Sequence, residues 1–374
     1  MSGPDRGARL AHLKLHDIRA FVEATLDVAR DGTTLITGPN GSGKTTVLEA
    51  VAYLGTQRSF RTTSRDAMVR IGCERAIVRA ELEREGRRVT VESELRVGGG
   101  ARTLVNRRTV QARSELSRAV PTTVFSPDDL GLVQGPPARR RDLLDGALGI
   151  VDHKAGAALD ALERVLRQRG ALLRQAAGRL SAEVAATLDV WDERLVASGE
   201  EVSEARRALV ADLEPRVAHA YAALAGHDRT ACHRSGQKAV SMEYRPGWDG
   251  PLAAALVQRR TEDVRRATST VGPQRDEVWC AITGRDARLH ASQGEQRSLA
   301  LALRLGIHAL VTERSGAAPL LLLDDVFSEL DRDRCRALVR HLPPGQALLT
   351  TTMALPEGVE VAAVVDVRAI GVRG

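Results

Sequence analysis

The sequence has few aromatic residues and few cysteines, and both scarcities narrow the kinds of protein it can encode. Aromatic residues make up 3% of the 374 residues, so the core has to be built from Leu, Val, Ile and Ala. The four cysteines lie far apart without a CxxC pair, which excludes a zinc knuckle and a disulfide scaffold. Segment 1–17 lacks the apolar core of a signal peptide, and no apolar run approaches the roughly 18 residues of a membrane span. These absences predict a soluble, cytoplasmic protein without a membrane partner.

Lysine is also scarce. Only four of the 54 basic residues are lysines: Lys14, Lys44, Lys154 and Lys238. The formal net charge of +6 is a weak indication of an acidic partner, since an Arg-rich composition also follows from a GC-rich genome. A lysine in such a chain indicates a position that requires it, because Arg and Lys are not interchangeable where geometry is tight.

Hydrophobic patterning predicts strands first and helices later. Residues 10–36 and 75–110 alternate apolar and polar residues around Gly-containing turns, and TTVF at 122–125 is a further short strand. From 138 to 225, apolar residues recur at three- to four-residue steps, which predicts two or three amphipathic helices interrupted near Gly170, Gly178 and Gly199. A loop-rich stretch at 226–250 and a helix at 252–267 follow.

After residue 285 the α/β pattern returns. It predicts helices at 293–313 and 331–341 and strands at 320–323, 347–351 and 361–366. The length favours two to three domains. We therefore predict an α/β P-loop lobe with a mixed sheet and an antiparallel β subdomain, formed by residues 1–130 and 285–374, and a helical insert at 131–284.

The segment GPNGSGKT, Gly38 to Thr45, matches the phosphate-loop pattern G-x-x-x-x-G-K-[ST]. A predicted strand precedes it, and a predicted helix begins at Lys44. The glycines let backbone N–H groups converge on phosphate, and the helix N-terminus adds positive potential. Lys44 is predicted to contact the β- and γ-phosphates, and Thr45 to bind Mg²⁺. The predicted nucleotide-binding residues of this segment are Gly38, Pro39, Asn40, Gly41, Ser42, Gly43, Lys44, Thr45 and Thr46.

A second motif, LLLLDDVFSELD at 320–331, is an apolar strand that ends in two carboxylates. Asp324 is predicted to hold Mg²⁺, directly or through water. Asp325 is predicted to orient or deprotonate the attacking water, because phosphoryl transfer depends on positioning and electrostatic stabilisation. Paired aspartates at a strand end also cap helices, but the phosphate loop upstream and the SELD that follows favour catalysis.

The third motif, ASQGEQRS at 291–298, opens the predicted helix at 293–313. Ser292 with Glu295 three residues later is a capping box, so the segment taken alone is an ordinary helix start. The order of all the motifs, GxxxxGKT, helical insert, SxGE, hhhhDD and SELD, resembles that of the ABC-type ATPases. In that family the Ser-x-Gly turn closes over the nucleotide of a second subunit. The resemblance thus implies that Ser292, Gln293 and Gly294 complete the site of a partner copy, with Ser292 acting in catalysis.

Other segments resemble the RecF family of bacterial recombination mediators, which are SMC-like ABC ATPases. They span nearly the whole chain: HLKLHDIRAF at 12–21, RSFR at 58–61, VFSPDDLGLVQGPPARRRDLLD at 124–145, LRQRGALL at 166–173, LDVWDERLVASG at 188–199, VGPQRDE at 271–277 and TTT at 350–352. The chain departs from that family at Gln274, where His is common, at Thr46, where Asn is usual, and at Gly170, where Asn is usual. Threonines at 350–352 replace the switch histidine of transporter ATPases.

The resemblance implies a function with defined cofactors and partners. It implies that ATP and Mg²⁺ drive homodimerisation around double-stranded or gapped DNA, and that slow, DNA-stimulated hydrolysis releases the clamp. RecR and RecO are the implied partners in loading RecA during recombinational repair. Asp325 stands where transporters carry Glu, for which reason we expect weak turnover.

Candidate DNA contacts are arginines, because backbone recognition of duplex DNA fits a chain poor in aromatic residues. The candidates are Arg58, Arg61, Arg139, Arg140 and Arg141, with Arg259, Arg260, Arg265 and Arg266 as a further group. At three- and four-residue spacing from Glu262 and Asp263, the last group also fits ordinary helix ion pairs. The run at 139–141 also fits an arginine that packs between parts of the chain.

Three alternatives remain at this stage. A transporter ATPase subunit would share the phosphate-loop motifs, but the long insert and the missing switch histidine disfavour it. A structural SMC-like head is a second alternative, although the insert lacks the sustained heptads of a long coiled-coil arm. In the third, catalysis is vestigial and the protein is an ATP-gated scaffold.

Overall fold

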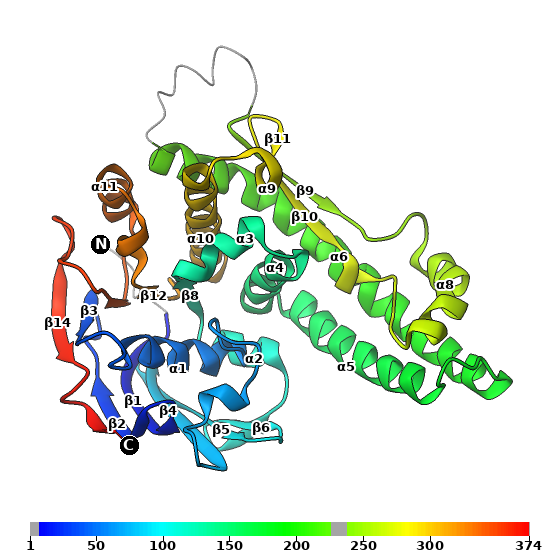
Figure 1. Cartoon of the computed structure of the whole chain (residues 1–374), viewed down its shortest axis with the longest axis horizontal. Helices are drawn as coiled ribbons and strands as arrows, with labels where there is room; N and C mark the ends of the chain where they lie inside the picture. The colour runs from blue at the N-terminus through cyan, green and yellow to red at the C-terminus, as the bar shows by residue number, and fades with distance from the viewer. Residues whose placement is uncertain (1–6, 226–237, 374) are drawn as a thin grey trace.

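A parallel sheet forms the centre of the first lobe in the computed structural model, which describes residues 7–225 and 238–373 (Figure 1). Its five strands run in the order β14-β3-β13-β12-β8, and every neighbouring pair is parallel. Strands covered by structure on both faces are near-continuous apolar runs, as the LLLL of β12 illustrates. The bounds are β3 Thr33–Thr37, β8 Thr122–Phe125, β12 Leu320–Asp324, β13 Ala347–Thr350 and β14 Val361–Asp366.

A second, antiparallel sheet contributes the other half of this lobe. Its order is β15-β2-β1-β4-β5-β6-β7, with β1 Arg9–Ile18, β2 Phe21–Asp27, β4 Arg75–Arg84, β5 Arg87–Arg96, β6 Ala101–Val105, β7 Arg108–Val110 and β15 Gly371–Arg373. Helix α1, Lys44–Thr56, lies between the two sheets and contacts strands of both. Its apolar residues, such as Leu48 and Val51, are fully buried on all sides. The predicted α/β lobe with a β subdomain is confirmed.

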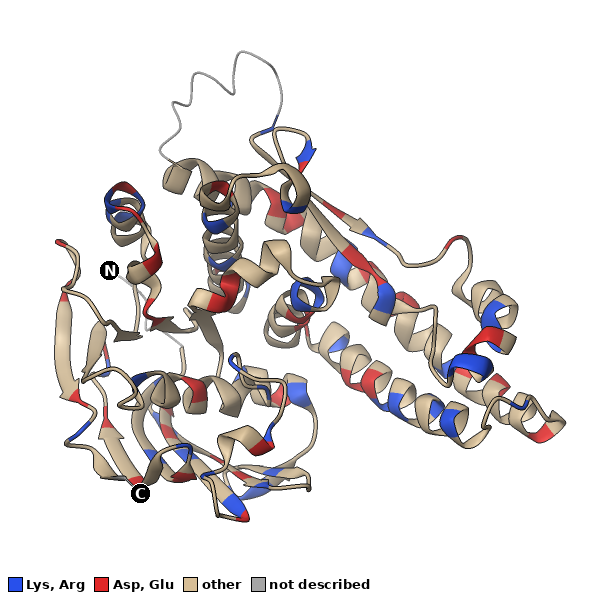
Figure 2. Ribbon diagram, in the orientation of Figure 1, with Lys and Arg blue, Asp and Glu red and all other residues tan. Residues whose placement is uncertain are grey.

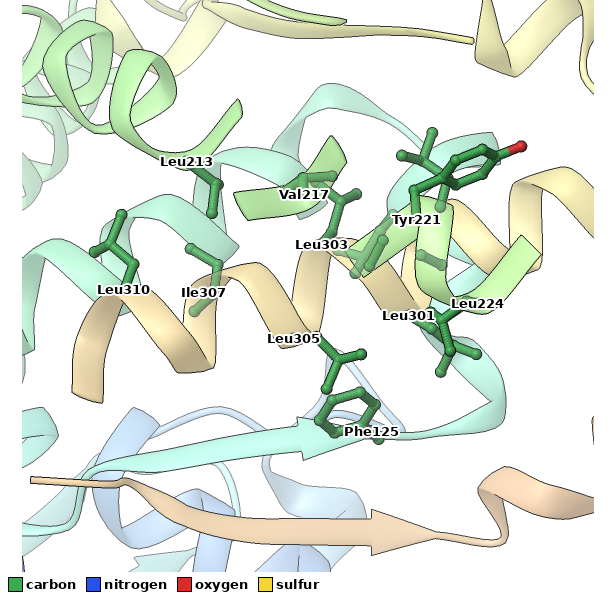
Figure 3. Close-up of a cluster of buried hydrophobic side chains, with 14 of the residues drawn as sticks. Phe125, Leu213, Val217, Tyr221, Leu224, Leu301, Leu303, Leu305, Ile307 and Leu310 are labelled. Carbon is green, nitrogen blue, oxygen red and sulfur yellow. The ribbon is translucent and has the colours of Figure 1, made fainter. Parts of the chain in front are cut away.

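Long helices extend from this lobe (Figure 1). They are α4 Pro137–Val151, α5 His153–Gln175, α6 Ala182–Ala225 and α8 Leu252–Arg266, and the short helices α2 Arg113–Ala119 and α3 Gly131–Gln134 precede them in the chain. Helix α10, Gln293–Ser315, covers the parallel sheet, and α6 packs on α10. Figure 3 shows this core: Leu301, Leu305 and Ile307 of α10 lie between Phe125 of β8 and α6 residues such as Leu213 and Tyr221. Two further helices are α9 Ala287–His290 and α11 Arg332–His341.

Two of the three predicted interruptions of the helical region are wrong. Helix α5 runs through Gly170 and α6 runs through Gly199. Of the three predicted positions only Gly178 lies in a break, at residues 176–181, and a further break falls at Asp152 between α4 and α5. Gly199 belongs to a close helix crossing: a Cβ there would lie 3.0 Å from Leu252 Cδ2 and 3.2 Å from Pro273 Cγ. The glycine therefore permits packing of α6 rather than ending it.

The insert also contains a small sheet that the patterning missed. Strand β9, Val240–Arg245, pairs with β10, Glu277–Ile282, which pairs with β11, Arg285–Asp286. Residues 240–245 lie inside the segment 226–250 that was predicted as loop, and residues 226–237 of that segment lie outside the described residues. The β10–β11 hairpin crosses residue 284, where the insert was predicted to end.

The outer part of the helical arm is fixed by a buried ion network. The fully buried Arg169 of α5 donates to Asp192 of α6 at 2.7 Å and to Asp263 of α8 at 2.8 Å. Each charge in this network is paired, which offsets the cost of removing it from water. The three helices of the arm therefore hold one relative position. No helix in the described ranges has both the length and the apolar character needed to cross a membrane.

Candidate nucleotide-binding site

The loop between β3 and α1 has the backbone geometry of a phosphate loop. Gly38 has φ +147°, and a Cβ on it would lie 2.6 Å from Val367 Cγ1 and 2.7 Å from Ser42 Oγ. Gly43, with φ +92°, turns the chain into α1 at Lys44. Both positions require glycine, because other residues are strained at such φ values and no space exists for a side chain at Gly38. The loop ends on the helix N-terminus, which favours an anion.

The polar side chains in this loop fit a phosphate ligand. The buried ammonium of Lys44 donates to the carbonyls of Gly38 at 2.8 Å and Pro39 at 3.0 Å. Ser42 Oγ is buried and has no hydrogen-bond partner in the part of the chain that the structure describes. A buried hydroxyl without a partner is costly, and a phosphate oxygen would satisfy it.

The first carboxylate is brought to the loop by the strand order. Strand β13 lies between β3 and β12, and its register pairs Thr350 with both Ile36 and Asp324. Asp324 Oδ1 accepts hydrogen bonds from Thr45 and Thr350, each at 2.8 Å. Burial raises the pKa of Asp324, although the two hydroxyls and the nearby charge of Arg61 oppose that rise. Thr45 and Asp324 offer the hard oxygen ligands that suit Mg²⁺.

Asp325 is held differently. It adopts a left-handed backbone conformation with φ +46°, and its N–H donates to Thr350 O at 3.1 Å. Its carboxylate accepts hydrogen bonds from the N–H and the hydroxyl of Thr352, both at 3.0 Å. The backbone turn separates the two carboxylates: Asp324 is tied to the phosphate loop and Asp325 to the segment after β13. This separation is what one metal-holding and one water-orienting carboxylate require.

Thr350 and Thr352 hold the two carboxylates, and the motifs did not assign them to the site. Replacing Thr350 with Val should lower kcat about tenfold, because Asp324 loses one of its two hydroxyl donors. That hydrogen bond contributes about 1.5 kcal/mol to holding the carboxylate in position. Thr351→Val is the matched control, since the Thr351 hydroxyl donates to Met353 O and not to a carboxylate of the site. Steady-state phosphate release measures both, and an unchanged kcat in Thr350→Val would contradict this role.

The Ser-x-Gly turn forms the N-terminus of α10. Ser292 Oγ accepts from the Glu295 N–H at 3.3 Å, and the Glu295 carboxylate accepts from the Ser292 N–H at 2.8 Å. The capping box is thus present. Ser292 and Gln293 are nevertheless exposed, and no hydrogen bond or ion pair joins residues 292–294 to the phosphate loop among the described residues. The structure does not bring the turn into the site of its own chain.

Two glutamines support this turn, and sequence reasoning missed both. The buried Gln296 donates to the carbonyls of Ala287 at 2.9 Å and Arg288 at 3.2 Å, which fixes the chain just before Ser292. Gln134 Nε2 in turn donates to Gln296 Oε1 at 2.6 Å. The end of the VFSPDDLGLVQG segment is therefore connected to the start of α10.

The predicted DNA contacts Arg58 and Arg61 have partners within the chain. Arg58 forms an ion pair with Asp142 of α4, although its side chain stays 48% exposed. Arg61 lies 3.5 Å from the fully buried Glu49 of α1, a carboxylate that Arg19 also holds at 2.7 Å. Because Arg61 is close enough to oppose the pKa rise of Asp324, it lies beside the nucleotide site. A DNA contact for these two residues stays a prediction.

The predicted phosphate contact of Arg140 is wrong. Its buried guanidinium forms two hydrogen bonds with Glu277, both at 3.0 Å, and another with Leu132 O at 2.8 Å. Arg141, half-buried, donates to Asp276 O at 2.5 Å. Arg139 is exposed and donates to Asp128 O at 3.0 Å. The alternative of a packing role is confirmed for Arg140, whereas DNA contacts of Arg139 and Arg141 stay predictions.

The basic residues of α8 are mostly paired. Arg265 and Arg266 both bind Glu262, and Arg260 binds Asp189 and Asp192. The ion-pair interpretation is confirmed for Arg265 and Arg266. Asp263 is buried against Arg169 and is not a surface partner.

The VGPQRDE segment is also structural. Asp276 is fully buried and accepts hydrogen bonds from Tyr244 and the Gly247 N–H, and burial raises its pKa. Gln274, which replaces the histidine common in the resembling family, donates to Val271 O at 2.7 Å.

Fold and site together define a class of protein. A phosphate loop and a carboxylate-ended strand meet at one edge of a parallel sheet, an antiparallel sheet covers the other side of α1, and a helical arm precedes a Ser-x-Gly helix start. This is the head of an ABC-type ATPase of the SMC-like kind. A family model described as the RecF/RecN/SMC N terminal domain matches residues 9–352.

Comparison with curated proteins narrows the class. The DNA replication and repair protein RecF of Streptomyces avermitilis is 38% identical over 359 residues, covering 91% of this chain and 92% of the relative. RecF of Kineococcus radiotolerans is 38% identical over 371 residues and covers 94% of each chain. The chain belongs to the RecF family. Because the chain belongs to this family, it is not a transporter ATPase subunit.

Solved structures agree with this assignment. A structure of the recombination mediator protein RecF with ATP, of the RecFOR pathway, has a TM-score of 0.81 at 26% identity and covers 95% of each chain. The Smc head domain of Pyrococcus furiosus has a TM-score of 0.51 at 17% identity and shares the fold alone.

Proposed function

We propose that this protein is an ATP-dependent DNA clamp of recombinational repair, in which two copies close on duplex DNA when ATP binds and separate after hydrolysis. The observation that carries the proposal is the division of the site. Phosphate loop and carboxylates are assembled within one chain, whereas the Ser292 turn is ordered, exposed and unconnected to them. A second copy supplies the turn to the open side of the nucleotide.

Each residue of the site has a role in ATP binding and hydrolysis. The loop N–H groups and Lys44 hold the phosphates, and Thr45 with Asp324 would hold Mg²⁺. When bound, the metal offsets the negative charge of the phosphates. Asp325, positioned by Thr352, orients the attacking water and accepts its proton. Ser292 and the N-terminus of α10 from the partner copy stabilise charge on the γ-phosphate.

A basic face on α5 is the DNA interface that the structure favours. Arg164, Arg167 and Arg174 follow a three- and seven-residue spacing that places them on one side of the helix, and all three are exposed. None of them has an ion-pair partner within the described ranges. Figure 2 shows the basic segments along α5.

The two acidic residues of the same helix, Asp160 and Glu163, contact α2. Asp160 accepts hydrogen bonds from the Arg113 N–H and the Ser114 hydroxyl, and Glu163 pairs with Arg113 at 3.7 Å. The unpaired positive charge therefore fits the phosphates of a duplex.

Duplex binding should require ATP and fall steeply with salt. Replacing Arg164, Arg167 and Arg174 together with Ala should reduce the slope of log affinity against log salt by about 3, since each phosphate contact contributes about 0.9. Fluorescence anisotropy of a labelled duplex across a salt series, with and without ATP, gives both quantities.

The matched control is Arg265→Ala with Arg266→Ala, which removes arginines already paired with Glu262 and should leave the slope within about 0.5 of wild type. Equal slopes for wild type and the triple variant would contradict the α5 interface. Binding that does not depend on ATP would contradict the clamp.

The similar RecF structures belong to the RecFOR pathway, which supports action together with RecR and RecO. In this proposal the closed dimer marks gapped or junction DNA in the cytoplasm for loading of RecA. Hydrolysis is slow and is stimulated by DNA, so that the clamp persists until the partners arrive.

A further inference from the structure

The Gly294 backbone is covered by an arginine from a different helix. A Cβ on Gly294 would lie 2.9 Å from Nη2 and 3.3 Å from Cζ of Arg334, so the guanidinium fills the space where a side chain would stand. Arg334 Nε donates to Ser298 Oγ at 3.0 Å, and that hydroxyl donates to Gly294 O at 3.0 Å. Ser298 is fully buried. The glycine is thus contacted directly and also through the serine.

The same arginine is anchored in the loop that follows the catalytic carboxylates. Its Nη1 forms an ion pair with Asp331, and its backbone N–H donates to Asp331 Oδ1 at 2.9 Å. A second bridge runs in parallel: Arg297 of α10 donates to Glu329 O at 2.9 Å and to the Glu329 carboxylate at 2.8 Å. Residues 329–331 and the first turn of α10 are therefore held together as one body.

We propose that Arg334 is a positioning residue for the composite site. It holds the Ser292–Gly294 turn in the position in which the turn can contact the nucleotide of the partner copy. This inference rests on the proposed ATP-dependent dimer. Its action is across subunits: Arg334 of one copy supports the turn that contacts ATP held by the other. The guanidinium fork suits this task because Nε reaches Ser298 while Nη1 holds Asp331.

The contacts of Arg334 and Arg297 also connect the two nucleotide sites of the dimer. The segment 325–331 begins at the carboxylate that faces the nucleotide of its own chain, and the turn faces the nucleotide of the partner. Arg334 and Arg297 connect the two, so a shift of the loop on one side moves the turn on the other. Loss of Arg334 should weaken closure of the dimer without weakening ATP binding by the single subunit.

The first experiment compares Arg334→Ala with Arg336→Ala. Arg336 is a matched position on the same helix, and its exposed side chain pairs with Asp333 at 3.7 Å. The ATP concentration for half-maximal dimerisation should rise at least about tenfold in Arg334→Ala and stay near wild type in Arg336→Ala. ATP affinity of the monomer should match in all three proteins. Equal dimerisation of Arg334→Ala and wild type overturns the inference.

A substitution at the glycine tests the contact itself. Gly294→Ala should impair dimerisation in the wild-type background, because the new Cβ displaces the guanidinium. In the Arg334→Ala background the same change no longer displaces a guanidinium, so its effect should be smaller than in the wild-type background. Additive effects of the two substitutions overturn the proposed contact.

Mixed dimers show in which direction Arg334 acts, with energy transfer between differently labelled subunits reporting only the mixed species. In the first pair, a Lys44→Ala subunit meets an Arg334→Ala subunit, so the one working phosphate loop faces an intact turn. In the second pair, wild type meets the Lys44→Ala, Arg334→Ala double variant, so the working loop faces the altered turn.

Cross-subunit action predicts that the first pair closes at lower ATP than the second, and the reverse order overturns it. A wild-type protein that stays monomeric with ATP overturns the proposed function and this inference together. A wild type that dimerises while Arg334→Ala dimerises equally well overturns this inference alone.

Discussion

Replacing Asp325 with asparagine should lower ATP turnover by about 10²- to 10⁴-fold, the usual contribution of a positioned general base. Asparagine keeps the shape of the side chain and still accepts the Thr352 hydrogen bonds, so the segment after β13 stays in place. It also tolerates the left-handed backbone conformation found at this position. The lost group is therefore the carboxylate charge alone. Phosphate release under saturating ATP measures the effect, while ATP affinity should stay unchanged.

The control is Asp333→Asn, the same chemical change on an aspartate that is 94% exposed and eight residues further along the chain. Its turnover should equal that of wild type. If Asp325→Asn also equals wild type, hydrolysis is not part of the mechanism, and the protein is an ATP-gated scaffold. This outcome separates an enzyme from the vestigial alternative.

Replacing Ser292 with arginine should abolish ATP-dependent dimerisation and leave ATP binding by the single chain intact. The turn is exposed, and within the described part of the chain no hydrogen bond or ion pair joins it to the phosphate loop, so the added side chain is accommodated in the monomer. In the dimer the same side chain would occupy the space that the nucleotide of the partner requires. Light scattering with ATP, together with an ATP titration, distinguishes the two effects.

Loss of the helix cap needs its own control, because an N-cap serine contributes about 1 kcal/mol to stability. Ser181→Arg removes a comparable cap, the exposed serine that accepts from the Val184 N–H at the start of α6, and should leave dimerisation intact. Ser292→Asp keeps the capping oxygen but sets a carboxylate opposite phosphate, and should also prevent dimerisation. A Ser292→Arg protein that dimerises normally with ATP would contradict the assigned role of the motif.

The parts of the site that the sequence predicted are those whose geometry is local. Gly38 to Thr45 form a turn whose shape depends on their own glycines, and Asp324 follows a strand whose apolar run identifies it. In an α/β protein, the carboxyl ends of neighbouring parallel strands meet at one edge. Motif and fold class together therefore predicted that Thr45 and Asp324 lie close together, and in the structure Thr45 Oγ1 is 2.8 Å from Asp324 Oδ1.

The parts that were missed depend on neighbours far along the chain. Thr350 acts because β13 lies between β3 and β12, and Gln134 acts because its partner Gln296 lies on another element. The sequence around Arg140 does not distinguish an arginine buried against Glu277 from one that contacts DNA. Strand β9 did carry a signal, since Val240, Met242 and Tyr244 alternate with polar residues and are the buried members of the strand.

The predicted helix interruptions at Gly170 and Gly199 were wrong because helix propensity is local and packing is not. A glycine in a helical pattern weakens helix propensity, which favoured interruptions at Gly170 and Gly199. At Gly199, packing of α6 against Leu252 and Pro273 outweighs that preference, because a Cβ would crowd both neighbours. Tertiary contact therefore decides whether a glycine ends a helix or allows it to pack.

The central claim is that ATP joins two copies of this chain through Ser292 and the phosphate loop. The most direct test is light scattering of the wild-type protein with and without ATP, in the presence and absence of duplex DNA. The account predicts the 40.3 kDa monomer without nucleotide and twice that mass with ATP, with the dimer persisting longest when DNA is present. A mass that stays at 40.3 kDa with saturating ATP, with or without DNA, would contradict it.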